Sequence, residues 1–231
     1  MHVPDGFLDA PTSVATAGVA AAAVAVALRG SRRELDERTA PMAGLVAAFV
    51  FAAQMLNFPV GAGTSGHLLG GALAVALVGP WTAVLAISVV LLVQALLFAD
   101  GGITALGTNV TLMAVVAVAA GWLVFRAAQQ VLPNTTRWIA PAAALGAFAS
   151  VPVTAAAFTG LYAVGGTAPI PFDGLLAAML GSHTLIGLGE AVITGLTVGS
   201  VTAVRPDLVH GARRALAGRP LDVRTPAPQE A

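Results

Sequence analysis

The first two residues of the chain can form a metal chelate. Methionine aminopeptidases remove Met1 only when the next side chain is small, so His2 predicts that Met1 is retained. The α-amine, the backbone nitrogen of His2 and its imidazole Nδ1 can then close adjacent five- and six-membered rings around one ion. A fourth nitrogen would complete a square plane, which suits Ni(II) or Cu(II), with Co(II) also possible.

His67 is the candidate for the fourth nitrogen. It lies in the glycine-rich stretch PVGAGTSGHLLGG, residues 59–71, which is better suited to a loop folded into the mouth of a bundle than to a regular helix. Taken alone, an N-terminal histidine is more often a solvated side chain. Its pairing with His67 is what favours a metal site made of Met1, His2 and His67.

His183 and Glu190 form a second polar pair inside the last apolar run. They are seven residues apart, so they share one helix face about two turns apart. An intramembrane carboxylate is expensive and usually functional. The pair is compatible with a proton relay, with a lower metal site, or with hydrogen bonding between helices, and we favour the structural role.

Four amide side chains are expected near the external ends of helices. Such amides serve as partners of a metal-ligating histidine or as hydrogen bonds between helices. They are Gln54, Asn57, Gln94 and Asn109. Ser65 lies two residues before His67 and completes the set of candidate site residues.

The composition predicts an integral membrane protein. Apolar residues make up 57% of the 231 positions and charged residues only 10%, too few to cover the surface of a soluble domain. We expect one all-α transmembrane domain over residues 1–205, with residues 1–11 as an external metal-binding segment. Cysteine is absent, which excludes disulfides and thiolate ligands.

The arginines decide how often the chain crosses. Apolar runs cover residues 12–28, 40–57, 68–79, 81–99, 110–125, 139–162 and 175–204. All eleven basic residues are Arg, and they share one side of the membrane only if the short run 68–79 also crosses. The positive-inside rule therefore favours a bundle of about seven transmembrane helices, with the N-terminus outside and the C-terminus in the cytoplasm. The polar tail, residues 206–231, is expected to be disordered.

Four motifs of the chain are MHVPDGFLDAP (1–11), AAQMLNFPVGAGTSGHLLGGALA (52–74), LLVQALLFADGGITALGTN (91–109) and SHTLIGLGEAVITG (182–195). They resemble the CbiM/NikM family, the substrate-specific membrane components of energy-coupling factor (ECF) transporters for cobalt and nickel. The resemblance implies that the Met1 amine, the His2 amide and imidazole and the His67 imidazole hold the metal. It also implies that the N-terminal segment inserts into the bundle from outside a prokaryotic cell membrane, and that the imported ion supplies cobalamin synthesis.

The resemblance also implies partners. These are a membrane coupling subunit, ATP-hydrolysing subunits and a small accessory membrane protein of the CbiN/NikN type. The chain has no phosphate-binding loop and no lysine to serve one, so we expect it not to be an enzyme. No permanent cofactor is expected, since Co²⁺ or Ni²⁺ is the substrate. The chain has no fused accessory spans after Val204, which favours cobalt slightly.

Two other functions are compatible with the same residues. A self-sufficient proton-coupled secondary transporter would use His183 and Glu190 as its relay, although internal repeats typical of such folds are not visible. An intramembrane hydrolase would use Ser65 with His67, but residues two apart in a glycine-rich loop are poorly placed as nucleophile and base.

Overall fold

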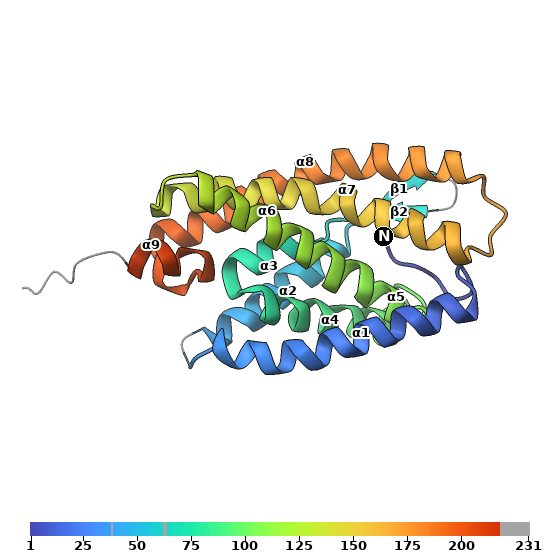
Figure 1. Cartoon of the computed structure of the whole chain (residues 1–231), viewed down its shortest axis with the longest axis horizontal. Coiled ribbons are helices and arrows are strands. Elements are labelled where there is room, and N and C mark those ends of the chain that lie inside the picture. Colours follow the sequence, from blue (N-terminus) through green and yellow to red (C-terminus); the bar gives the residue numbers. More distant parts are fainter. Residues whose placement is uncertain (38, 62–63, 218–231) are drawn as a thin grey trace, which may run out of the picture.

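The computed structural model describes residues 1–37, 39–61 and 64–217, which form a bundle of helices elongated along one axis (Figure 1). The first half contains α1 (Ala10–Gly30), η1 (Ser31–Arg33), α2 (Ala40–Gln54), β1 (Phe58–Gly61), β2 (Thr64–Gly66), α3 (Gly71–Val78) and α4 (Pro80–Leu97). The second half contains α5 (Leu106–Asn109), the π-helix η2 (Val110–Val116), α6 (Ala117–Val131), η3 (Thr136–Trp138), α7 (Ile139–Gly165), α8 (Phe172–Val204), η4 (Pro206–Leu208), η5 (His210–Ala212) and α9 (Arg213–Ala217).

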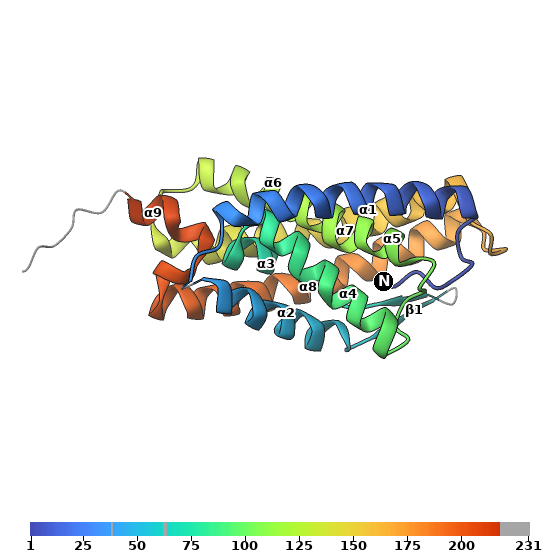
Figure 2. The same cartoon turned by 90° about the horizontal axis from the view of Figure 1, so that it is seen from below.

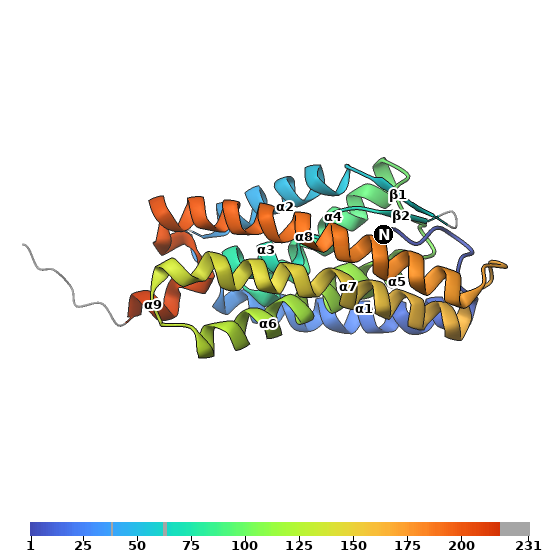
Figure 3. The ribbon, with the colours of Figure 1, turned by 90° about the horizontal axis from the view of Figure 1, so that it is seen from above.

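The helices run between two ends of the bundle. The N-terminus, the hairpin of β1 and β2, α5 and the α7–α8 turn lie at one end, which we call the N-terminal end (Figures 1 and 2). The α1–α2 connection and α9 lie at the opposite end. The two strands pair antiparallel, with Phe58 opposite Gly66, and the three views agree that the N-terminus lies beside this hairpin (Figure 3).

Five helices of the described residues are long and apolar enough to cross a membrane. They cover residues 10–33, 80–97, 106–131, 136–165 and 172–204. Their outward faces carry large apolar side chains, such as Leu123, Leu188 and Leu196, which are 53–68% exposed and suit contact with lipid. The sequence therefore correctly predicts a multi-pass helical membrane protein.

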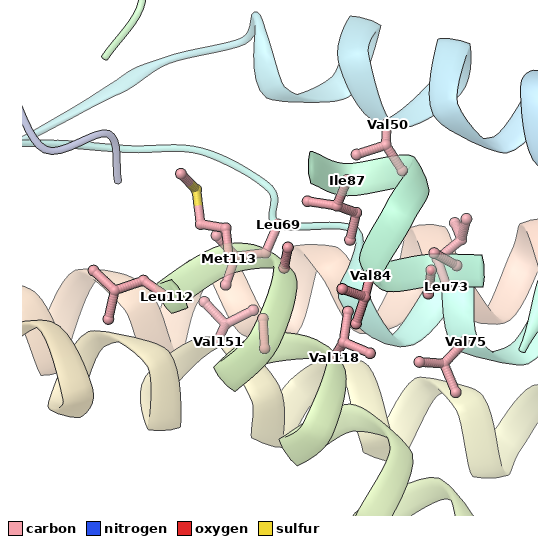
Figure 4. Packing of buried hydrophobic residues seen from close by; sticks show 14 of the residues in the cluster. Val50, Leu69, Leu73, Val75, Val84, Ile87, Leu112, Met113, Val118 and Val151 are labelled. Carbon is pink, nitrogen blue, oxygen red and sulfur yellow. The ribbon is translucent and has the colours of Figure 1, made fainter. Parts of the chain in front are cut away.

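α2 and α3 are shorter than the other apolar helices. α2 has 15 residues, and α3 has eight, so α3 covers only about 12 Å. All eight residues of α3 are buried. Figure 4 shows its Leu73 and Val75 among Val50 of α2, Val84 of α4 and other apolar side chains of η2, α6 and α7. This short helix is thus the centre of the core.

Side-chain oxygens cap two of the helices at their N-termini. Asp9 accepts a hydrogen bond from the backbone nitrogen of Thr12 at 2.9 Å and begins α1. Glu34 lies in the α1–α2 connection and accepts from the backbone nitrogens of Trp81 (3.2 Å) and Thr82 (2.7 Å), in the first turn of α4. Negative charge at a helix N-terminus is stabilising, so Glu34 joins the α1–α2 connection to α4.

The segment after α8 differs from the expectation of a disordered tail. Residues 206–217 form η4, η5 and α9, because Val209 and Ala212 are fully buried in the core. Gly211 supports this packing, since a Cβ there would lie 2.6 Å from the ring of Phe125. The rest of the expected tail, residues 218–231, lies outside the described residues.

Candidate metal centre

The N-terminal segment is inserted into the bundle. Met1 is 2% exposed and Val3 is 1% exposed. The side chain of Asn109, at the end of α5, holds the backbone of Val3 on both sides: its Oδ1 accepts from Val3 N at 2.7 Å, and its Nδ2 donates to Val3 O at 3.1 Å. Gly102 N donates to the same carbonyl at 2.9 Å. Three hydrogen bonds to the backbone of Val3 therefore hold the first three residues in place.

Two aspartates secure the rest of this segment. Asp5 Oδ1 accepts from the backbone nitrogen of Thr104 at 2.7 Å and from its hydroxyl at 2.5 Å, and the pKa of Asp5 is lowered mainly by the hydroxyl bond. Asp9 N donates to the carbonyl of Gly165 at 2.7 Å. The segment is thus joined to both the α4–α5 loop and the end of α7.

The imidazoles of His2 and His67 lie against each other. Their ring centroids are 4.5 Å apart, and the rings are stacked with an interplanar angle of 27°. His2 Nε2 lies 3.1 Å from Gln94 Oε1, and its Nδ1 lies 3.1 Å from Asp100 Oδ1. Asp100 is partly buried, and its pKa is lowered mainly by the contact with His2. The structure therefore brings together both predicted histidines and adds a carboxylate.

His67 has a free ring nitrogen in a buried position. The side chain is fully buried, and its Nδ1 lies 2.8 Å from the carbonyl oxygen of Leu68. Because a carbonyl only accepts, Nδ1 carries the proton and Nε2 carries a lone pair. Nε2 is buried and has no hydrogen-bond partner among the described residues. An imidazole whose other nitrogen donates to a carbonyl is the usual arrangement of a metal ligand.

Burial keeps two of the predicted ligands unprotonated. It lowers the pKa of the Met1 α-amine to about 4, although the charge of Asp100 acts in the other direction. It also lowers the pKa of His67 well below the usual value, and electrostatic interaction with the N-terminus and His2 acts in the same direction. At neutral pH both groups therefore have lone pairs available for a cation.

The four predicted amides all lie around this centre. Besides the contacts of Gln94 and Asn109, Gln54 is fully buried and donates to the carbonyl oxygen of Leu69 at 2.9 Å. Asn57 hydrogen-bonds Asp100. Gln94 thus contacts a predicted ligand, Gln54 and Asn109 hold the chain near one, and Asn57 contacts the carboxylate beside His2.

Glu190 holds the chain that follows His67. Its two carboxylate oxygens accept from the backbone nitrogens of Leu69 at 2.6 Å and Gly70 at 3.0 Å. His183 is buried on the same helix, and its Nδ1 lies 2.9 Å from the carbonyl oxygen of Met179. Glu190 therefore contacts the backbone just before α3, and its structural role stays a prediction.

Gly101 allows a close approach to the site. Its φ of +91° is a conformation that side chains rarely adopt. A Cβ there would lie 3.0 Å from Asn109 Nδ2 and 3.2 Å from His2 Cδ2. The glycine therefore lets the loop after α4 pack against the N-terminal segment.

Sequence reasoning did not identify Asp100 as a neighbour of His2. The only signal was its acidic side chain directly after the apolar run 81–99. Within the described part of the chain, no three or more His, Cys, Asp or Glu side chains form a group able to hold a metal ion. The side chain of Ser65 lies outside the described part of the structure.

Comparison with known proteins gives a consistent group of relatives. Residues 2–208 match the family described as the cobalt uptake substrate-specific transmembrane region, CbiM. The cobalt transport protein CbiM of Sorangium cellulosum is 35% identical over 214 residues, which are 90% of this chain and 94% of that protein. The fused nickel transport protein NikMN of Rhodobacter capsulatus is 35% identical over 230 residues, 92% of this chain and 65% of that protein. A crystal structure of a truncated transition metal transporter superposes with a TM-score of 0.77 at 31% identity, covering 88% of this chain and 99% of that one.

Proposed function

Because the chain belongs to the CbiM family of cobalt-uptake transmembrane proteins, we propose that it captures a divalent transition metal ion for import, with Co²⁺ slightly preferred over Ni²⁺. The ligands are the Met1 amine, the backbone and imidazole nitrogens of His2, and Nε2 of His67. The observation that carries this assignment is the buried Nε2 of His67, which has no partner among the described residues and lies beside the ring of His2.

Metal binding changes the position of His2. The two rings are stacked, whereas imidazoles that share one ion direct their nitrogens towards it. His2 Nδ1 therefore exchanges its contact with Asp100 for the metal, and Nε2 of His67 occupies the remaining corner of the plane. The Asp100 carboxylate then lies close to the ion and offsets part of its charge, as partners around a metal site commonly do.

The protein crosses the membrane seven times in this proposal, with the N-terminus outside. The segment between His67 and Gly79 supports the count, because it joins the two ends of the bundle. His67 contacts the N-terminal segment, whereas a Cβ at Gly79 would meet Glu34 and His210 at the opposite end. An extended stretch followed by α3 makes this crossing, which explains why its helix is short.

The chain acts as the substrate-binding component of an ECF transporter in a prokaryotic cell membrane. Coupling and ATP hydrolysis belong to separate subunits. The relatives named as fused NikMN proteins support an association with a small NikN-type membrane protein. The α-amine is essential to this function, so any residue joined to Met1 should prevent capture.

The test is calorimetric titration of purified protein with Co²⁺ and Ni²⁺. One form has the native Met1, and a second has a single alanine before it. Because that residue also has to fit a buried position, His67→Ala is measured in parallel, with His210→Ala as a control histidine outside the site. We expect tight binding by the native and His210→Ala proteins and loss of binding by the other two. Equal binding by all four would refute the proposed ligands, and the preferred metal is given by the same titrations.

A further inference from the structure

A basic pocket lies at the opposite end of the bundle from the metal centre. It is a cavity of about 130 Å³ between α6 and the segment that follows α8. Its lining residues are Trp122, Phe125, Arg126, Gln129, His210, Gly211, Arg213 and Arg214. The proposed import function uses none of these side chains.

The arginines of this pocket have no acidic side-chain partner among the described residues. Arg126 lies over the ring of Trp122, 5.2 Å from its centroid. Arg213 donates to the backbone carbonyl of Glu34 at 2.6 Å, and not to its carboxylate. Neither of these arginines nor Arg214 forms a salt bridge with a described residue. In the described structure the pocket therefore has more basic than acidic groups, even with the Glu34 carboxylate close to His210, and attracts anions.

His210 contributes an unpartnered nitrogen. Its Nδ1 is buried and has no hydrogen-bond partner in the described part of the chain. Burial lowers the pKa of His210 to about 4, and the charges of Arg213 and Arg126 act in the same direction. The neutral ring can donate one N–H to a bound anion.

An apolar groove begins at the same tryptophan. Its volume is about 390 Å³, and it runs between α1, α4 and the helix formed by η2 and α6. Its lining includes Val26, Trp81, Val84, Val118 and Trp122. Trp122 lines both the groove and the basic pocket, so the two cavities are adjacent.

We propose that this pocket and groove bind one anionic phospholipid, with its phosphate between Arg126, Arg213 and His210 and one acyl chain along the groove past Trp122. Basic pockets between transmembrane helices are suited to the head groups of anionic lipids. Two tryptophans, Trp81 and Trp122, line the groove, and tryptophan is enriched at the membrane interface. The lipid site does not depend on metal binding.

The experiment is native mass spectrometry of the delipidated full-length protein, titrated with phosphatidylglycerol or with phosphatidylcholine of the same chain length. The test variant is Arg126→Gln/Arg213→Gln. The control is Arg32→Gln/Arg33→Gln, which removes two exposed arginines from the same end of the bundle. Glycerol phosphate, which has no acyl chain, serves as the competitor.

We expect phosphatidylglycerol to bind more tightly than phosphatidylcholine. Each pocket arginine should contribute about fivefold, so the test variant should weaken phosphatidylglycerol binding about 25-fold and the control should leave it nearly unchanged. Equal weakening by both variants would show a general effect of charge and would overturn the proposal. Displacement of the lipid by glycerol phosphate at the same concentration would also overturn the proposal, because the groove would then contribute nothing to the affinity.

Discussion

Replacing Glu190 with glutamine should weaken metal binding although Glu190 contacts no proposed ligand. Both of its carboxylate oxygens accept backbone N–H groups, from Leu69 and Gly70, immediately after His67. Glutamine has one oxygen and one NH₂ group. One backbone N–H would therefore lose its acceptor and face another donor in a fully buried position.

The size of the effect follows from the lost hydrogen bond. Leaving one buried donor unsatisfied costs about 1–3 kcal/mol, and the new NH₂ group adds a second unsatisfied donor. The chain between His67 and α3 relieves this cost by moving, which displaces Nε2 of His67 from the site. Removing partners of metal ligands typically lowers metal affinity about 10–100-fold, and we expect Glu190→Gln to fall in this range.

The assay is a Co²⁺ titration of Glu190→Gln beside Thr194→Val. Thr194 is fully buried one turn further along the same helix, and its hydroxyl has no partner in the described structure. We expect the glutamine variant to keep one site per protein with a lower affinity, while the valine variant matches the native protein. Native affinity in Glu190→Gln, or an equal loss in both variants, would refute the positioning role.

Three further predictions concern other residues. Because the pKa of the Met1 amine is lowered to about 4, protons should compete with metal at this group only as the pH falls towards that value. A titration from pH 8 to 6 should therefore show a shallower loss of affinity than in a peptide of residues 1–11, whose amine has the usual pKa near 8. Gly101→Ala should lower the Co²⁺ affinity, since the left-handed conformation costs about 1–2 kcal/mol, whereas Gly160→Ala, where a Cβ meets nothing within 4 Å, should not. Glu34→Gln should lower the free energy of unfolding in detergent by about 1 kcal/mol, because it weakens the cap of α4. Equal melting temperatures of the variant and the native protein would contradict this.

Sequence motifs predicted the family, and the comparison with relatives confirms it. The same motifs also placed His2 and His67 in one site, and the structure brings their rings together. The four amides were predicted only in general terms, as partners of a histidine or of a neighbouring helix. Their individual contacts depend on how helix ends meet in space, and no local pattern specifies that.

The role of Glu190 and the folded residues 206–217 were harder to predict. Glu190 contacts residues about 120 positions earlier, so its partners depend on the register between α8 and the chain before α3. The polar composition after Val204 predicts disorder, yet burial of Val209 and Ala212 is enough to order the first part. Two small apolar side chains in a polar segment give little signal in the sequence.

The N-terminal segment covers the proposed metal site, to which it would contribute ligands. Met1 and His67 are buried, and the segment is tied down by hydrogen bonds to Asn109, Gly102 and Thr104. An ion held beneath it would return to the outside only when these bonds open. The affinity for the ion would then depend on the nitrogen ligands, whereas its residence time would depend on the hydrogen bonds of the segment. Substitutions in those hydrogen bonds could therefore change the residence time without changing the affinity.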